Sequence, residues 1–220
     1  MTPSEAPLVS RIKSIKVRFR QNGIQCTGAT VYLETYREEW KDKLPQEATP
    51  LLILGGLWRQ LEQSEQTEEG LLAAARAQSK QYPEIKLFKD IPGIGFISAA
   101  TISAMLETPY RFADKRKVWM YAGLGIMTRS SGDKVYSEKL STDYNRLLKY
   151  ILKQAAEAAI RAEDNPFRRK YLDMTLLHTI APHLAKLTIA RDMLATMWAM
   201  WRKGEKYSPE IREKAAYQQI

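Results

Sequence analysis

Residues 87–106 read LFKDIPGIGFISAATISAML, in which a short helical run meets a Gly-hydrophobic-Gly turn and a second helical run follows. Glycine suits such a turn because it tolerates a positive φ angle and lets another backbone come close. The amides at Gly93, Gly95 and the next helix start would point outward, where the helix dipole adds partial positive charge. The pattern predicts a helix-hairpin-helix motif that binds nucleic-acid phosphates without reading the bases. A helical corner without a ligand is the alternative.

The positive charge of the chain is concentrated in its second half. The 220 residues carry a formal net charge of +9. The first 110 residues hold 13 Lys/Arg and 13 Asp/Glu, whereas the last 110 hold 21 and 12. A surface that serves only solubility more often mixes the two signs. The asymmetry therefore indicates that the second half meets an anionic partner.

The composition argues against several classes of protein. Cys26 is the only cysteine, so no disulfide can form within the chain, which suits a reducing compartment. The two histidines lie far from that cysteine, so we expect neither a metal site nor a cofactor in this chain. No apolar run approaches the roughly 20 residues that span a bilayer, and the N-terminus lacks a signal-peptide pattern. We therefore expect a cytoplasmic protein without a membrane partner.

Helical periodicity dominates the sequence and predicts an all-α fold. Residues 1–82 are predicted to form a helical hairpin or a dimerising coiled coil. Residues 83–207 are predicted to form a helical domain around the Gly93/Gly95 turn, and residues 208–220 a C-terminal tail. We find no convincing strand. Residues 123–142 are the only long non-helical segment of the second half, and loops of that length are usually functional or disordered.

A basic segment surrounds this loop. Residues 111–153 contain ten Lys/Arg and four Asp/Glu. Within the loop, Ser130 and Ser131 precede Gly132, and a serine held there can attack a phosphodiester while nearby cations neutralise the developing charge. A plain loop linker is the alternative. The cations predicted to contact nucleic acid are Lys115, Arg116, Lys117, Arg129, Lys134, Arg146 and Lys149.

Short blocks in a fixed order connect the chain to a known family. They are Ile91-Pro92-Gly93-Ile94-Gly95, Arg111-Phe112, Tyr121-Ala122-Gly123-Leu124, Ser130-Ser131-Gly132, Asn145, Leu148-Lys149, Leu152, Ala155-Ala156, Asn165-Pro166-Phe167, Ala190-Arg191-Asp192-Met193-Leu194 and Gly204-Glu205-Lys206-Tyr207. Through them, residues 87–207 resemble the C-terminal domain of the transposases of the insertion-sequence family one-ten (one-ten / one-sixteen / nine-oh-two). Residues 11–44 resemble the segment between the two conserved domains of that family.

The resemblance implies that two domains contribute different residues to the reaction. Such transposases carry an N-terminal RuvC-like domain whose four acidic residues bind divalent metal, and we expect that domain to be absent here. Magnesium is accordingly expected only together with the RuvC-like domain. The C-terminal domain of the family carries a serine thought to join covalently to DNA. By position that serine is Ser131, with Ser130 as the second choice.

The chain departs from the family pattern near this serine. The usual Lys and Gly before Asn145 are replaced by Thr142 and Tyr144, and a more usual Arg by Lys149. A bidentate phosphate contact would be lost at the last of these positions. The geometry of the loop is therefore expected to differ from that of the family.

Two hypotheses of function follow from the resemblance. In the first, the chain is the DNA-binding C-terminal portion of an insertion-sequence transposase, with a serine nucleophile for strand exchange. Alone it would bind DNA, or an assembly of guide RNA and DNA, without strand transfer. In the alternative, it is a non-catalytic remnant that binds DNA, or that assembles with a full-length transposase and regulates it. Its expected partners are DNA, a guide RNA as used by some family members, and a second copy or a partner transposase chain.

Overall fold

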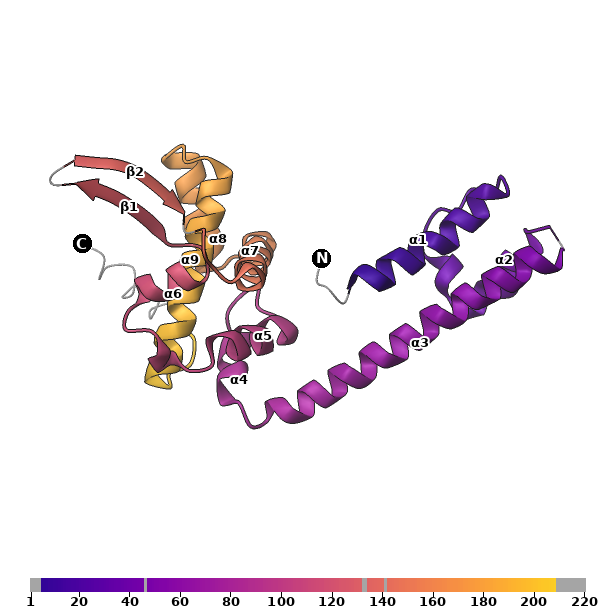
Figure 1. Cartoon of the computed structure of the whole chain (residues 1–220), viewed down its shortest axis with the longest axis horizontal. Coiled ribbons are helices and arrows are strands. Elements are labelled where there is room, and N and C mark those ends of the chain that lie inside the picture. The colour runs from indigo at the N-terminus through magenta and orange to yellow at the C-terminus, as the bar shows by residue number, and fades with distance from the viewer. Residues whose placement is uncertain (1–4, 46, 132–133, 141, 209–220) are drawn as a thin grey trace. The chain divides into compact units, whose positions relative to one another are not determined.

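The computed structural model describes residues 5–45, 47–131, 134–140 and 142–208 (Figure 1). The chain divides into two compact units, Met1–Gln78 and Ser79–Ile220. Each unit has its own buried apolar cluster. The two units are therefore described separately.

The first unit is a helical hairpin built on two long helices. Its elements are α1 (Glu5–Gln21), the 3₁₀ turns η1 (Thr30–Tyr32) and η2 (Glu34–Tyr36), α2 (Arg37–Asp42) and α3 (Ala48–Ser79). Ile15 and Phe19 of α1 share a buried cluster with Trp58 of α3, whose indole Nε1 donates to the carbonyl of Val31 at 2.8 Å. The last buried residue of α3 is Leu61. The rest of that helix lies outside this core.

The second unit packs its helices around α9. Its first elements are α4 (Pro83–Lys89), α5 (Phe96–Leu106), η3 (Pro109–Arg111) and α6 (Lys115–Tyr121). These are followed by β1 (Ile126–Ser131), β2 (Lys134–Leu140), α7 (Arg146–Arg161), α8 (Pro166–Leu172), the π-helical turn η4 (Asp173–Leu177) and α9 (Pro182–Lys203). Helix α9 contacts α4, α6, α7 and α8. It therefore supplies the central wall of the core.

Apolar periodicity explains why α7 and α9 pack so closely. The buried residues of α7 recur at intervals of three and four, which places them on one helix face. The buried face of α9 is continuous over most of its length. Gly204 ends α9 in the left-handed conformation, and its amide donates to the carbonyl of Trp201. The buried residues of α7 are Leu148, Ile151, Leu152, Ala155, Ala156 and Ala159.

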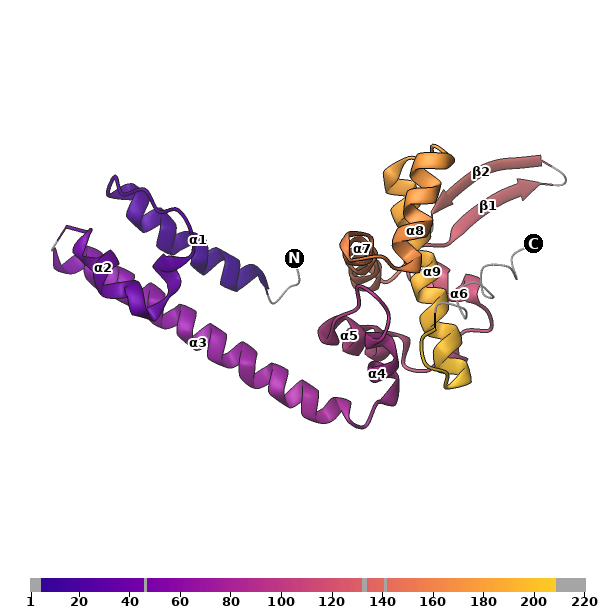
Figure 2. The same ribbon diagram turned by 180° about the vertical axis from the view of Figure 1, so that it is seen from behind.

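The predicted all-α class is confirmed, with one local exception. Residues 126–140 form a two-stranded antiparallel hairpin in which β1 pairs with β2. The prediction that no strand occurs was therefore wrong for this segment. The pattern was hidden because the hairpin is mostly polar, so its period of two has little apolar contrast. Figure 2 shows the two strands extending from the helical part of the second unit.

Two further findings concern the predicted motif and membrane contact. The turn at Gly93 and Gly95 joins α4 to α5, but its identity as a helix-hairpin-helix motif stays a prediction. Among the residues described here, no helix is both long and apolar enough to cross a bilayer.

Asn165 holds the turn between α7 and α8. Its side chain is 7% exposed; its carbonyl oxygen accepts from the amides of Phe167 and Arg168, and its Nδ2 donates to the carbonyls of Ala159 and Glu163. We expect Asn165→Ala to destabilise the second unit by about 2 kcal/mol, because a helix cap is lost and a buried carbonyl loses its donor. Thermal unfolding measures the effect. Asn165→Asp keeps the acceptor and should cost less; equal stability of all three proteins would contradict this role.

Candidate nucleic-acid interface

The polar hairpin is tied at both ends to helix α6. On the entry side, the amides of Leu124 and Gly125 donate to the carbonyl of Trp119 at 2.8 and 2.9 Å. On the exit side, the amide of Asn145 donates to the carbonyl of Tyr121 at 2.9 Å. The C-terminal end of α6 therefore meets the N-terminal end of α7 at the base of the hairpin.

Helix α6 presents three of the predicted cations. Asp114 caps the helix, because its carboxylate accepts from the amides of Arg116 and Lys117 at 2.7 and 3.0 Å. Arg116 and Lys117 are exposed, whereas Lys115 is half-buried with its ammonium 5.9 Å from the ring centroid of Trp119. The cap stabilises the first turn of α6 and so fixes the backbone positions from which these side chains extend.

Helix α7 presents two more of the predicted cations beside an aromatic ring. Arg146 is its exposed first residue. The ammonium of Lys149 lies 4.2 Å from the ring centroid of Tyr144, a cation–π distance. Gly123 has a φ of +66°, and a Cβ added to it would lie 2.4 Å from the Tyr144 ring. The Tyr144 ring is therefore accommodated because Gly123 has no side chain.

The hairpin carries the remaining predicted residues. Ser131 is the last residue of β1 and pairs with Lys134, and Ser130 pairs with Val135. The register shifts by one residue between Arg129 and Ser130, which marks a bulge. Gly132 lies outside the described residues. The serines thus stand at the outer end of the hairpin, and the helix-borne cations stand near its base.

The two turn glycines have different surroundings. Gly93 has a φ of +85°, and a Cβ added there would lie 2.4 Å from the carbonyl oxygen of Ala155 and 2.7 Å from the amide nitrogen of Ala159 in α7. Gly95 is exposed, has a φ of −84°, and would meet nothing within 4 Å. Close packing against α7 therefore explains why a glycine stands at position 93. Of the two glycines, only Gly95 is exposed.

The structure adds a residue that was not predicted as part of the site. The Nε of Arg191 in α9 donates to the carbonyl of Leu124 at 2.5 Å, and the indole Nε1 of Trp119 donates to the carbonyl of Arg191 at 3.0 Å. Burial lowers the pKa of the Arg191 guanidinium from its ordinary value. Arg191 stands in one of the blocks that carry the family resemblance, but only its contact with the hairpin base reveals its role. Arg191 therefore links the hairpin base to α9 through these hydrogen bonds.

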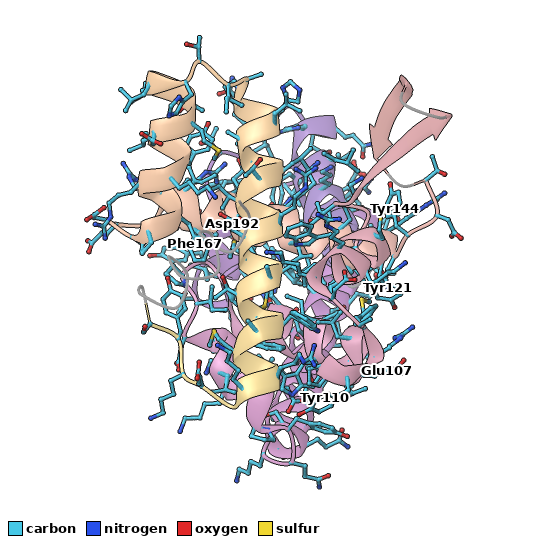
Figure 3. All side chains as sticks on the ribbon, turned by 90° about the vertical axis from the view of Figure 1, so that its left-hand side faces the viewer. Glu107, Tyr110, Tyr121, Tyr144, Phe167 and Asp192 are labelled. Carbon is cyan, nitrogen blue, oxygen red and sulfur yellow. The ribbon has the colours of Figure 1, made fainter. Side chains whose placement is uncertain are left out.

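Tyr121 is another aromatic ring with a nearby cation, and it lies beside this base. Tyr121 donates its hydroxyl to the carbonyl of Met105 at 3.2 Å and accepts from Nδ2 of Asn145 at 3.3 Å. The guanidinium of Arg111 lies 4.8 Å from the Tyr121 ring centroid. Figure 3 shows Tyr144 and Tyr121 on one side of α9 and Phe167 on the other. Aromatic rings with nearby cations therefore line the side that carries the hairpin.

The described residues hold no group of three or more His, Cys, Asp or Glu side chains that could bind a metal ion. The helices at the hairpin base carry cations instead, and such groups recognise phosphate by charge and hydrogen bonding.

Comparison with known proteins finds a family model that matches part of this unit. Residues 85–172 match the model of the Transposase IS116/IS110/IS902 family. These residues include the glycine turn, the hairpin and both helices at its base.

Three insertion-element proteins are similar over longer stretches. An uncharacterised 43.6 kDa protein of insertion element IS110 from Streptomyces coelicolor is 26% identical over 168 residues, 76% of this chain and 41% of that protein. An uncharacterised 44.8 kDa protein of IS116 from Streptomyces clavuligerus is 28% identical over 127 residues, 56% of this chain and 31% of its own length. The transposase for insertion sequence element IS1111A from Coxiella burnetii is 26% identical over 141 residues, 64% of this chain and 38% of that transposase.

The chain thus spans less than half the length of these relatives. The similarity to all three covers more than half of this chain. Together with the match of residues 85–172 to the family model, it supports a relation between this chain and the IS116/IS110/IS902 transposases.

Proposed function

We propose that this chain is the DNA-binding C-terminal part of an insertion-sequence recombinase, with Ser131 as its nucleophile. One observation carries the proposal: exposed cations stand on α6 and α7, the two helices that are joined at the base of a hairpin whose outer end holds the serine. Cations at that position can hold a phosphate backbone. A hairpin rising from the same place can then bring a nucleophile to the strand.

The binding step requires no base recognition. Arg116 and Lys117 leave the first turns of α6, and Arg146 leaves the first turn of α7. Lysine and arginine side chains attract phosphates without distinguishing sequences. Any choice of DNA site is therefore assigned in this proposal to another part of the assembly, such as a guide RNA.

The chemical step is a transesterification. The Ser131 hydroxyl oxygen forms a bond to phosphorus while the bond from phosphorus to one sugar oxygen breaks. The serine proton passes to a base or to solvent, and the leaving sugar oxygen takes up a proton. The number of phosphoester bonds is unchanged, so the strand can be rejoined by the reverse reaction. Cations at the site stabilise the charge that develops on the phosphoryl oxygens.

The proposal assigns other functions to other chains or domains. In this proposal the metal-binding acids are assigned to a RuvC-like domain elsewhere in the assembly, as the family resemblance implies. A partner transposase chain would supply it. Binding of DNA by the chain alone is then expected without efficient strand exchange.

The salt dependence of DNA binding tests the electrostatic part of the proposal. If about six phosphates are contacted, the logarithm of the association constant should fall against the logarithm of the salt concentration with a slope of about −5. Replacing Arg116, Lys117 and Arg146 together by alanine should make the slope less steep by about 3. Fluorescence anisotropy on duplex DNA at several salt concentrations measures both.

A matched control separates local contacts from net charge. Lys80, Lys86 and Lys89 are also exposed, and replacing them by alanine changes the net charge by the same amount. That triple variant should keep the original slope. Equal slopes for the two triple variants, or a slope near zero for the unaltered protein, would contradict binding through α6 and α7.

A further inference from the structure

A cluster of two aromatic rings and one guanidinium lies at the C-terminal end of α9. The guanidinium of Arg202 is 4.9 Å from the ring centroid of Trp198 and 5.7 Å from that of Tyr110. The Tyr110 side chain is 70% exposed, and Arg202 is exposed as well. Figure 3 shows Tyr110 beside this end of α9. The ring of Tyr110 and the guanidinium of Arg202 are thereby presented to solvent.

The fold holds these groups in place. The indole Nε1 of Trp198 donates to the carbonyl of Pro109 at 2.8 Å, which ties α9 to the turn η3. Pro109 is buried, and the hydroxyl of Thr108 accepts from the amide of Tyr110 at 3.4 Å. The Trp198 indole and the backbone of Tyr110 are therefore fixed before binding, which lowers the entropy cost of ordering the site.

Packing in the core does not explain why the Tyr110 ring is where it is, since that ring is mostly exposed. Trp198 packs against the buried cluster of the unit, but most of the Tyr110 ring faces water. Exposed Tyr, Trp and Arg together are typical of binding surfaces. The ligand must offer a flat face for the rings and a negative group for the guanidinium.

An unpaired nucleotide satisfies both requirements. Every base has a π face that stacks on an aromatic ring, and its phosphate is anionic. Bases inside a duplex are already stacked on their neighbours, so they cannot cover an exposed ring on a protein surface. The positive charge of the second half of the chain further favours a nucleic acid over an acidic protein surface. A single strand is therefore the occupant that these observations favour.

We propose that Tyr110, Trp198 and Arg202 form a stacking platform for an unpaired base of single-stranded nucleic acid. The inference rests on the proposed function, because it assumes that this unit binds nucleic acid. It adds a ligand class and a site away from the serine-bearing hairpin. Trp198 and Arg202 also lie beyond residues 85–172, which match the family model.

The test compares single-stranded and duplex DNA on the full chain. Anisotropy titrations use a fluorescent oligothymidylate and a duplex of the same length. Tyr110→Ala should weaken binding of the single strand about tenfold, since one stacked base is lost. It should leave duplex binding within about twofold and the salt slope unchanged, since no charge and no phosphate contact is removed.

Control variants test the chemistry of the platform. Tyr110→Phe keeps the ring and should bind like the unaltered protein. Arg202→Lys keeps the charge but loses the planar guanidinium, and should weaken single-strand binding several-fold. Tyr82→Ala removes another exposed tyrosine of the same unit and should have no effect. Unchanged thermal unfolding shows that each variant is folded.

The possible outcomes distinguish this inference from the proposed function. If duplex binding remains salt-dependent but Tyr110→Ala and Arg202→Lys leave single-strand binding unchanged, the platform is wrong and the proposed function stands. If Tyr110→Ala weakens both ligands equally, the assignment to an unpaired base is wrong. If the unaltered chain binds neither ligand at low salt, the proposed function and the platform both fail.

Discussion

Ser131→Ala is expected to abolish covalent attachment of this chain to DNA, with a loss of at least about a thousandfold in adduct formation. Removing a nucleophile eliminates the bond-forming atom, whereas removing a binding residue only weakens the complex. DNA affinity should stay within about twofold because a serine hydroxyl carries no charge. The measurement is a denaturing gel of nicked duplex DNA carrying the element ends, incubated with the chain and a full-length transposase. The adduct of this chain is recognised by its lower mass.

Ser130→Ala is the matched control for this prediction. The two serines occupy adjacent register positions, Ser130 opposite Val135 and Ser131 opposite Lys134. The same atoms are therefore removed from the same strand, one residue away. If Ser130→Ala abolishes the adduct and Ser131→Ala does not, the nucleophile is misassigned. If both single variants form as much adduct as the unaltered chain, neither serine is the nucleophile, and the non-catalytic alternative gains support.

Gly93→Ala is expected to destabilise the second unit by about 3 to 4 kcal/mol. The φ of +85° costs an alanine about 1–2 kcal/mol. The added Cβ would also lie 2.4 Å from the Ala155 carbonyl oxygen, so the turn between α4 and α5 must move away from α7, which costs about 1–3 kcal/mol more. For a unit of this size the transition temperature should fall by about 10 °C. Calorimetry of the full chain measures it.

Two other glycines isolate the two causes. Gly204 has a φ of +67° but nothing within 4 Å of a built Cβ, so Gly204→Ala should cost only the backbone strain, about 1 kcal/mol. Gly95 has an ordinary φ and open space, so Gly95→Ala should cost less than about 1 kcal/mol. If Gly93→Ala proves no worse than Gly204→Ala, close packing on α7 is not what fixes Gly93.

This series also separates folding from phosphate binding at the turn. Gly95→Ala leaves the fold intact, so any loss of DNA affinity in that variant reports on the exposed start of α5. A loss of affinity in Gly93→Ala alone follows from unfolding. The double replacement of both glycines cannot make this distinction.

The sequence by itself determined the helices and the location of the charge. Two stretches of the predicted all-α chain form the long helices Ala48–Ser79 and Pro182–Lys203. Their boundaries follow from local causes: apolar spacing along each helix, Pro182 at the start of α9 and Gly204 at its end. The distribution of charge along the chain is likewise read directly from the sequence.

The cations of the candidate site were partly predictable for the same reason. Arg116, Lys117 and Arg146 stand in a basic segment, and the structure places all three on exposed helix positions. The connection of their two helices at the hairpin base was not predictable. It depends on the hydrogen bond between the Asn145 amide and the Tyr121 carbonyl, which joins residues 24 positions apart.

Only the tertiary structure decided what the special residues do. Gly93 and Gly95 look equivalent in sequence, yet α7 approaches one of them and leaves the other open. Arg191 contacts Leu124 across 67 positions of sequence, and Trp198 contacts Pro109 across 89. The physical reason is common to these cases. Helix formation depends on neighbours within a few residues, whereas the role of a glycine, a ring or a guanidinium depends on which distant backbone folding brings within contact distance.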